Sequence, residues 1–342
     1  MILVTGGTGM VGAHLLYRLI KDGHRVRAIK RKTSNIEIVK KIFSYYSNEF
    51  ETLFSKIEWM DADLLDNEKI YHAMQGIENV FHTAAMVSFN PSDRDRMIEN
   101  NVKGTTILVN AALENKVKGF CHVSSIASLG AADKEKMIDE NTFRNPRAKY
   151  SGYSISKYYS ELEVWRGITE GLPAFIINPS IILGPGNWKS GSPSFFSNVN
   201  KGMKFYPPGM KGFVDVIDVV NLMILLMEKK TFGERYIVSS ENLSFKEIFD
   251  KMAEILEVQK PKYVAGPYLL GLAWRIEYLK YILTGKDPLL TKNSAASGIK
   301  IDKYSNEKIK KELDYSFNPI DECIKRIGRN YLSDIKSFTI NA

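Results

Sequence analysis

Cysteine is scarce in this sequence of 342 residues, which contains only Cys121 and Cys323. Two cysteines so far apart provide neither a disulfide framework nor the close ligand spacing of a zinc site. The five histidines also lack metal-ligand spacing. We therefore expect no bound metal and a reducing compartment, for which the cytoplasm is the natural choice.

Long apolar runs are missing as well. The most apolar stretch, residues 263–283, is interrupted by Arg275, Glu277 and Lys280, whereas a membrane-spanning helix needs about 20 mostly apolar residues. This stretch predicts an amphipathic helix that packs inside the protein, without stable membrane insertion. Contact with a membrane surface or with an apolar substrate is the less favoured interpretation. The N-terminal residues have no charged n-region and no long apolar segment, so we expect no secretory signal.

No block of like charge occurs either. The formal net charge is +8, but the basic residues are spread along the chain among 39 acidic residues. A nucleic-acid-binding protein usually gathers its basic residues into a stripe or a cluster. We therefore expect a small-molecule substrate and no nucleic-acid partner.

Short apolar runs alternate with helical periodicity in the first half of the chain. This alternation predicts βαβ units and hence an α/β fold with a doubly wound parallel sheet. The predicted strands are Ile2–Val4, Val26–Ile29, Ile57–Met60, Val80–His82, Phe120–Val123 and Ala174–Asn178. The predicted helices lie near 10–22, 67–75, 94–115 and 153–170.

The pattern changes after Pro179, where glycine and proline cluster in loops. A helix over Asp218–Glu228 and a strand at Tyr236–Val238 then predict a return to the sheet. Ser244 and Glu247 have the spacing of a capping box that opens a further helix. The rest of the chain, to about Leu332, predicts helices with short loops.

A glycine-rich turn follows the first predicted strand. Its glycines are spaced for a tight turn, for close approach of the backbone to a pyrophosphate, and for contact between helix and strand. The helix that follows offers free N–H groups and a partial positive charge to phosphates. Because the turn joins a strand to a helix within a βαβ unit, it predicts a bound dinucleotide. The expected contacts are with Gly6, Thr8, Gly9, Met10, Val11 and Gly12.

The end of the second strand indicates which dinucleotide binds. NAD-binding proteins usually carry an acidic residue about 20 residues after the glycines, but this chain has Lys30, Arg31 and Lys32. Arg31 is suited to hold a 2′-phosphate with two hydrogen bonds, and its neighbours add positive charge. The sequence therefore predicts NADP, with NAD as the alternative. Asp63, after the third strand, is placed to accept a hydrogen bond from the adenine amino group, although helix capping explains it equally simply.

A tyrosine and a lysine four residues apart, Tyr153 and Lys157, lie on one face of a predicted helix. A neighbouring ammonium lowers the pKa of a phenol, which favours proton exchange near neutral pH. The same spacing recurs at Tyr17 and at Tyr304, so it is weak by itself. Only Tyr153 has a strand ending in hydroxyl residues before it, and Ser125 there is placed to bind a substrate oxygen. We predict a catalytic group of Ser125, Tyr153 and Lys157.

These residues together resemble the extended short-chain dehydrogenase/reductases, the NAD-dependent epimerase/dehydratase family. The likeness covers nearly the whole chain. It rests on the segments 5–12, 61–64, 82–85, 101–105, 123–125, 153–157, 178–180 and 213–216.

The resemblance implies a Rossmann-type sheet with a smaller, mostly helical C-terminal substrate lobe, and often a homodimer. It places the NADP-binding domain at 1–178, with 212–240 returning to it, and the lobe at 179–342, mainly 179–211 and 241–342. It also implies that Asn101 supports the active site. The further cofactor contacts expected, besides Tyr153 and Lys157, are with Arg31, Lys32, Asp63, Leu64, Ala84, Ala85, Ser124, Pro179 and Ser180.

Within this family the chain looks most like the dihydroflavonol reductase and 3β-hydroxysteroid dehydrogenase branch, which acts on apolar ring ketones and alcohols. Sugar 4,6-dehydratases carry acidic residues after the catalytic Ser/Thr, whereas Ile126 and Ala127 follow Ser125. We expect an NADP-dependent oxidoreductase that moves a hydride between nicotinamide and a ketone or secondary alcohol. The alternatives are a nucleotide-sugar epimerase with tightly held NAD and, less favoured, a non-catalytic NADP-binding sensor or scaffold.

Overall fold

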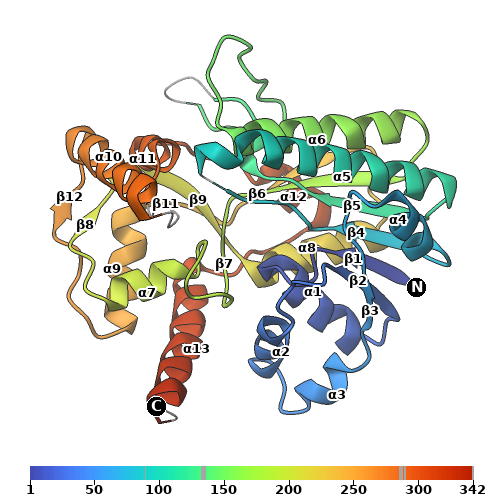
Figure 1. Ribbon diagram of the computed structural model, residues 1–342, viewed down its shortest axis with the longest axis horizontal. Helices are drawn as coiled ribbons and strands as arrows, with labels where there is room; N and C mark the ends of the chain where they lie inside the picture. Colours follow the sequence, from blue (N-terminus) through green and yellow to red (C-terminus); the bar gives the residue numbers. More distant parts are fainter. Residues whose placement is uncertain (89, 132–135, 285–287, 289, 341–342) are drawn as a thin grey trace.

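The computed structural model describes residues 1–88, 90–131, 136–284, 288 and 290–340. Its core is a seven-stranded sheet in the order β10-β6-β5-β4-β1-β2-β3, with each neighbouring pair parallel. Figure 1 shows this sheet in one half of the molecule. The strands are β1 (Ile2–Thr5), β2 (Val26–Lys30), β3 (Glu58–Asp61), β4 (Asn79–His82), β5 (Gly119–Val123), β6 (Ala174–Pro179) and β10 (Arg235–Val238).

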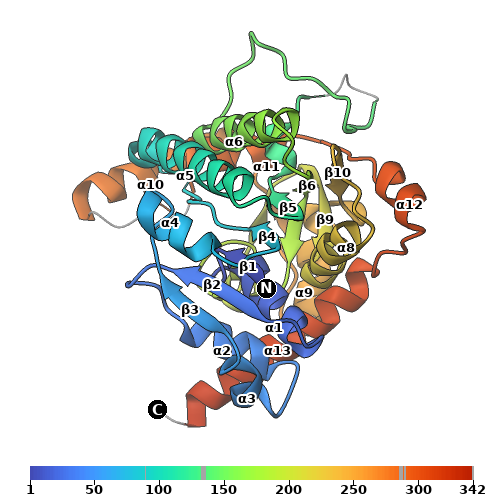
Figure 2. The same ribbon diagram turned by 90° about the vertical axis from the view of Figure 1, so that its right-hand side faces the viewer.

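Helices cover both faces of this sheet, as Figure 2 shows from the end. Successive strand residues point to opposite faces, so Leu3 and Val4 belong to different cores. One core includes residues of α4 (Asn67–Met74), α5 (Arg94–Glu114) and α6 (Gly152–Thr169). The other includes residues of α1 (Met10–Lys21), α2 (Glu37–Ser44), α8 (Val216–Glu228) and α12 (Glu307–Leu313). The α/β, Rossmann-type fold expected from the sequence is confirmed.

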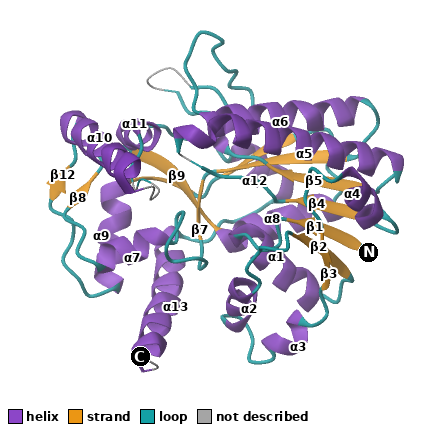
Figure 3. Cartoon of the chain, viewed as in Figure 1, coloured by secondary structure: helices purple, strands orange, loops and turns teal. Residues whose placement is uncertain are grey.

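A second, smaller region lies beside the sheet (Figure 3). It contains a three-stranded sheet, β11-β9-β7, and a two-stranded sheet, β12-β8. Its strands are β7 (Ile181–Leu183), β8 (Phe205–Tyr206), β9 (Met210–Asp215), β11 (Glu241–Ser244) and β12 (Tyr263–Val264). Its helices are α7 (Ser194–Asn200), α9 (Phe245–Ile255), α10 (Pro267–Thr284), α11 (Lys292–Ile299) and α13 (Ile320–Ile340).

Some elements were not expected from the sequence. Helix α2 buries Val39, Ile42 and Phe43, whose spacing is a helical signal, and α3 (Phe50–Phe54) follows it. The short strands of the lobe are too brief to show a period of their own. The expected capping box is present, because Ser244 and Glu247 each cap the other's backbone at the start of α9.

The apolar stretch 263–283 differs most from expectation. It forms β12 and then α10, but Leu270 is the single buried residue of that helix among those the structure describes. Much of the helix therefore lies on the surface instead of packing inside the protein. Within the described residues, no helix has the length and apolar character needed to cross a membrane.

Candidate active site

The glycine turn lies at the carboxyl end of β1, where the backbone is packed too tightly for side chains. Gly6 has φ +70°, and a Cβ on it would lie 2.5 Å from the backbone nitrogen of Ala84. A Cβ on Gly12 would lie 2.2 Å from the carbonyl oxygen of Gly6. Helix α1 begins at Met10, and its N-cap residue, Gly9, has no side chain with which to cap the first amide groups. A close backbone cradle at a helix N-terminus fits the pyrophosphate of a dinucleotide.

The basic residues after β2 differ in their partners. Lys30 forms an ion pair with Asp61, with 2.5 Å between Nζ and Oδ1, so its charge is already neutralised. Arg31 and Lys32 are exposed, and the Arg31 backbone N–H donates to Ser34 Oγ at 3.1 Å. The structure thus leaves the Arg31 side chain facing solvent at the strand end, where the 2′-phosphate was predicted.

Asp63 lies in the loop after β3 and is exposed. Its Oδ1 accepts the backbone N–H of Leu65 at 3.0 Å, so it stabilises its own turn. The N-cap of α4 is Asp66 instead, whose side chain accepts from the Lys69 N–H. Helix capping therefore does not explain Asp63. Leu64 lies against α5, because a Cβ on Gly104 would lie 3.0 Å from the Leu64 side chain.

Below the glycine turn, a chain of hydrogen bonds joins β1, β4 and α5. Thr5 Oγ1 lies 2.7 Å from His82 Nδ1, and His82 Nε2 lies 3.1 Å from Thr105 Oγ1. Thr105 in turn donates to the carbonyl oxygen of Asn101 at 2.7 Å. Burial lowers the pKa of His82 to about 3, with a smaller contribution from the charge of Lys157. His82 is therefore neutral, and its role in the fold is to connect strand ends.

Ser125 and Tyr153 meet at the carboxyl edge of the sheet. Ser125 is the second residue after β5 and caps a short 3-10 turn, and its Oγ accepts the Ala127 N–H at 3.2 Å. Tyr153 lies in the first turn of α6, which Ser151 caps through its side chain. The Tyr153 and Ser125 side chains are hydrogen-bonded to each other. The structure thus brings together the phenol and the hydroxyl that the sequence singled out.

Lys157 lies one turn after Tyr153 and is only 4% exposed. Its Nζ donates to the carbonyl oxygen of Val123 at 2.8 Å, which fixes the ammonium under the end of β5. Burial lowers the pKa of Lys157 to about 8, and the charge of Glu161 opposes this effect. Burial also raises the pKa of Tyr153, against the hydrogen bond from Ser125. The sequence led us to expect a lowered pKa for the Tyr153 phenol, but desolvation of the buried phenol outweighs that effect.

Asn101 is buried in α5 and joins two parts of the site. Its Oδ1 accepts the backbone N–H of Met86 at 2.7 Å, and its Nδ2 donates to the Met86 carbonyl at 2.9 Å. Its Nδ2 also lies 3.1 Å from Ser156 Oγ, which donates to the carbonyl oxygen of Tyr153 at 2.9 Å. Asn101 therefore ties the loop after β4 to the helix that carries Tyr153.

The remaining residues that were predicted to contact the cofactor differ in their solvent exposure. Ala84 and Ala85 are partly exposed beside the glycine turn, and the Ala84 N–H donates to Thr5 Oγ1 at 3.3 Å. Ser124 and Ser180 are 4% and 6% exposed, and their Oγ atoms are buried. Neither hydroxyl group has a hydrogen-bond partner among the described residues, and the cofactor contacts expected for them stay predictions. Pro179 ends β6 beside them.

A buried carboxylate that the sequence did not single out lies near the predicted catalytic residues. Glu161, 2% exposed, follows Lys157 by one helical turn. Its Oε1 lies 2.5 Å from Ser128 Oγ and 2.5 Å from Asn178 Nδ2, and its Oε2 lies 3.4 Å from Arg235. The signal for this residue was the spacing of four between Lys157 and Glu161.

The partners of Glu161 also hold the backbone of Ser125. Asn178 Nδ2 lies 3.1 Å from the Ser125 carbonyl oxygen, and Ser128 Oγ lies 2.8 Å from the same atom. The single hydroxyl proton of Ser128 is therefore shared between Glu161 and this carbonyl. The network fixes the position of Ser125, the residue whose hydroxyl was predicted to bind the substrate oxygen.

A pocket of about 230 Å³ opens beside Tyr153. Its walls come from the loop after β4, the start of α5, the start of α6 and α11. The lining residues are Ser88, Asn90, Arg94, Met97, Tyr150, Ser151, Gly152, Tyr153 and Asn293. Such a mixed polar and apolar pocket next to a phenol is suited to a small organic substrate.

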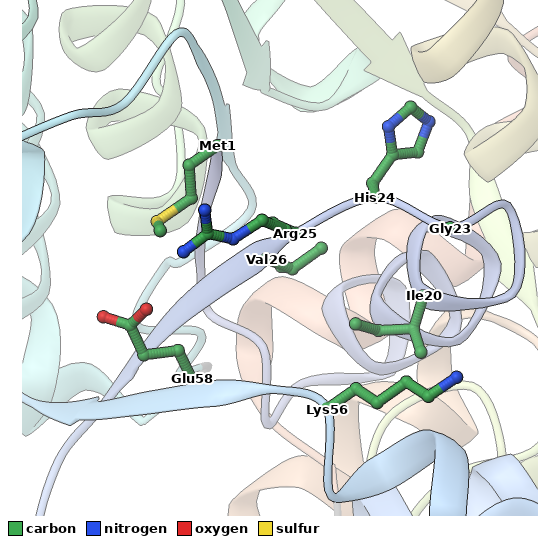
Figure 4. Close-up of a pocket in the computed structure, with 8 residues that line it drawn as sticks. All are labelled: Met1, Ile20, Gly23, His24, Arg25, Val26, Lys56 and Glu58. Carbon is green, nitrogen blue, oxygen red and sulfur yellow. The ribbon is translucent and has the colours of Figure 1, made fainter.

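A larger pocket, of about 400 Å³, lies at the other edge of the sheet. Figure 4 shows its lining, which includes Arg25, Val26 and Glu58 at the amino ends of β2 and β3. Ligands of doubly wound sheets bind at the carboxyl ends of strands. This pocket is therefore not part of the candidate active site.

The other two Tyr–Lys pairs are elsewhere. Tyr17 stacks on Tyr46 with ring centroids 4.5 Å apart. Tyr304 is 6% exposed, and Lys308 pairs with Glu234 at 2.7 Å. Tyr17 and Tyr304 therefore take part in packing. This agrees with the expectation that only Tyr153, which follows a strand ending in hydroxyl residues, belongs to the site.

Comparison with known proteins agrees with this arrangement. The sequence profile described as the NAD dependent epimerase/dehydratase family matches residues 2–239. A protein named sterol demethylase protein B, from Methylococcus capsulatus, is 30% identical over 274 residues, covering 79% of each chain. A putative dihydroflavonol 4-reductase from Synechocystis is 30% identical over 280 residues, covering 79% of this chain and 77% of the other.

Solved structures are similar over almost the full length. A protein named gox2253 superposes with a TM-score of 0.80 at 30% identity, over 98% of both chains. UDP-glucose 4-epimerase from Thermotoga maritima superposes with a TM-score of 0.77 at 21% identity, over 98% of this chain and 99% of the other. The second likeness concerns the fold alone. The family and branch expected from the motifs are confirmed: this chain belongs to the NAD dependent epimerase/dehydratase family, the extended short-chain dehydrogenase/reductases, and is an NAD(P)-dependent enzyme of their dihydroflavonol reductase-like branch.

Proposed function

We propose that this protein is an NADP-dependent ketone reductase or secondary-alcohol dehydrogenase that acts on a small organic substrate. The observation that carries the proposal is the hydrogen bond between Ser125 and Tyr153, the second of which lines a pocket of about 230 Å³. Both hydroxyl groups are donors, so both are suited to a carbonyl oxygen that gains negative charge.

Each residue of the group has a separate task. Ser125 holds the substrate oxygen with a hydrogen bond, and Tyr153 transfers its phenolic proton to that oxygen. Because burial raises the pKa of Tyr153, the phenol is protonated at neutral pH and serves as the acid in the reductive direction. Bound NADPH supplies the hydride. Lys157, one helical turn from Tyr153, is expected to stabilise with its positive charge the phenolate left after proton transfer.

The preference for NADP is supported by the residues after β2. Arg31 and Lys32 are exposed there, while Lys30 is neutralised by Asp61. An exposed guanidinium at this position favours a doubly charged phosphate over a neutral ribose hydroxyl. The sequence carries no acid between Lys30 and Ser34 that would bind the hydroxyl groups of NAD.

The test uses purified protein, NADPH or NADH, and a panel of ketones, with oxidation of the nicotinamide followed by absorbance. We expect turnover that requires added NADPH and is much slower with NADH. Copurified NAD, together with interconversion of a nucleotide sugar without added cofactor, would assign the protein to the epimerases instead. Binding of NADPH without turnover of any carbonyl would indicate a sensor.

A further inference from the structure

Helix α10 presents its apolar stripe to solvent. The side chains at 269, 272, 276, 279 and 283 recur at intervals of three and four and so share one helix face. They are Leu269, Leu272, Ile276, Leu279 and Leu283, with exposures of 40%, 58%, 47%, 57% and 75%. A stripe with this spacing ordinarily faces a protein core.

The inward face of α10 is the one with polar atoms. Trp274 packs with Leu270 of the same helix and with Ala295 of α11. The Tyr281 hydroxyl lies 3.2 Å from Ser92 Oγ, close to the start of α5. Glu277, on the same side, pairs with Lys280 at 2.7 Å and has a side chain only 17% exposed. The helix is thus docked through its mixed face, and its apolar stripe has been left outward.

The exposed apolar surface continues from the helix onto the two-stranded sheet. Phe205 on β8 and Tyr263 and Val264 on β12 are 48%, 58% and 53% exposed, and Figure 1 places β8, β12 and α10 at the same end of the molecule. We call this surface the α10 face. It comprises Phe205, Tyr263, Val264, Tyr268, Leu269, Leu272, Ile276, Leu279, Ile282 and Leu283. Exposed apolar side chains gathered in this way at one end of a molecule mark an interaction site.

The charges that border the α10 face are positive. Lys204 and Lys262 directly precede Phe205 and Tyr263, and their backbones are joined by a hydrogen bond of 3.1 Å. On the helix, Arg275 and Lys280 are exposed, but the charge of Lys280 is balanced by its ion pair with Glu277. Apolar side chains bordered by lysine and arginine match a bilayer surface, where acyl chains lie below anionic head groups.

We propose that the α10 face docks on the surface of a membrane that contains anionic lipid. A second copy of the chain suits the face less well, because a two-fold contact would bring together two copies of a surface bordered by Lys204, Lys262 and Arg275. The face also extends past the helix onto β8 and β12, farther than a simple pairing of two helices would cover. Docking is superficial, since α10 does not meet the requirements for a spanning helix.

The position of the face adds a consequence for the pocket beside Tyr153. Asn293, the second residue of α11, lines that pocket, and α11 packs against the inner side of α10. Docking through α10 therefore brings one wall of the substrate pocket near the lipid surface. This location suits a substrate that dissolves in membranes.

The experiment measures cosedimentation of the full chain with vesicles of phosphatidylcholine, alone or mixed with phosphatidylglycerol. The wild-type protein is expected to sediment with the mixed vesicles and much less with the neutral ones. The double variant Leu272→Glu/Leu279→Glu is expected to lose binding. Lys204→Gln/Lys262→Gln is expected to weaken it by roughly fivefold for each lysine removed.

Matched controls alter similar residues outside the face. Phe143→Glu changes a side chain that is 86% exposed in the loop before α6, and Lys103→Gln/Lys229→Gln removes two exposed charges that are not part of the α10 face. Both should bind as wild type does, and thermal unfolding verifies that all variants fold. Absence of sedimentation with mixed vesicles overturns the proposal. So does a dimer, seen by sedimentation velocity, that Leu272→Glu/Leu279→Glu dissociates. Neither readout uses catalysis, so the proposed reductase activity stands or fails separately.

Discussion

Asn178 on β6 donates a hydrogen bond from Nδ2 to Oε1 of Glu161 on α6, across 2.5 Å. Through this contact the carboxylate is linked to the backbone of Ser125, which the Asn178 amide also contacts, and it lies one helical turn from Lys157. Glu161 is a positioning residue in this arrangement, because it acts on the reacting groups through other side chains.

Replacing Glu161 by Gln should therefore lower kcat more than it raises KM. Misplacement of a reacting group by about 1 Å can reduce the rate by about 10²-fold. The variant should also move the alkaline limb of the pH–rate profile to lower pH, because Glu161 raises the pKa of Lys157. Besides Tyr153, one helical turn away, two further titratable groups interact with Lys157, and both of these, His82 and His122, are kept neutral by burial. A loss of stability with an unmoved alkaline limb would reduce Glu161 to a structural role.

The variant Tyr153→Phe tests whether Tyr153 is the acid that protonates the substrate oxygen. Removing the phenolic hydroxyl should reduce kcat by about 10²- to 10⁴-fold, while the dissociation constant for NADPH, measured by fluorescence titration, should change little. Ser125→Ala removes a hydrogen bond but leaves the proton donor, so its effect should be smaller. Substantial turnover by Tyr153→Phe would contradict the role given to this residue.

Arg31→Ala tests the cofactor preference. Loss of a charge-assisted hydrogen bond of about 1.5–3 kcal/mol should weaken NADPH binding by roughly 10- to 100-fold. NADH binding should be almost unchanged, because NADH has no 2′-phosphate. The matched control is Arg25→Ala, which removes an exposed arginine at the opposite edge of the sheet. Equal weakening for both cofactors would remove the proposed phosphate contact.

The buried ammonium of Lys157 should make stability depend on pH. Its pKa is about 8 in the folded protein against 10.5 for the free side chain, so between these values the unfolded chain binds the extra proton. The free energy of unfolding should therefore increase as pH rises from 8 to 10.5. Urea unfolding at both pH values measures this slope. Lys157→Met, which cannot titrate, should lack that part of the increase.

Arg326→Met should destabilise the joint between α13 and the rest of the protein. The guanidinium binds both oxygens of Asp215, at 2.9 Å and 2.6 Å, and Asp215 is fully buried at the start of α8. Breaking one side of a buried pair costs about 3–5 kcal/mol. Chemical unfolding should show this loss, whereas Arg329→Met on the exposed side of the same helix should have little effect. Equal free energies of unfolding for the two variants would contradict the stabilising role of the Arg326–Asp215 pair.

Local signals in the sequence were enough to predict the sheet and the central group of the site. The alternation of apolar runs and helical periods indicated six of the seven central strands in order, and Tyr236–Val238 indicated the last. Tyr153 could be separated from Tyr17 and Tyr304 because it alone follows a strand that ends in hydroxyl residues. Ser244 and Glu247 were recognised as a capping box because that motif depends on neighbours in sequence.

Features that depend on contacts between distant segments could not be predicted in this way. Glu161 and Asn178 meet only when α6 packs on the sheet, and neither has a sequence signal of its own for that contact. The outward orientation of α10 was missed for a related reason. Its spacing specifies an apolar face, but periodicity does not say whether that face meets a core or the solvent.

The chain passes from β6 to β7 within two residues, from Pro179 to Ile181. Asn178, which holds the backbone of Ser125 through a hydrogen bond, is thus almost adjacent to the first strand of the smaller region. Substitutions after Ile181 can change which substrates bind and leave Ser125, Tyr153 and Lys157 intact. Related proteins can therefore carry out one reaction on different substrates. The same short joint limits how far the lobe can tilt before the chemistry itself is disturbed.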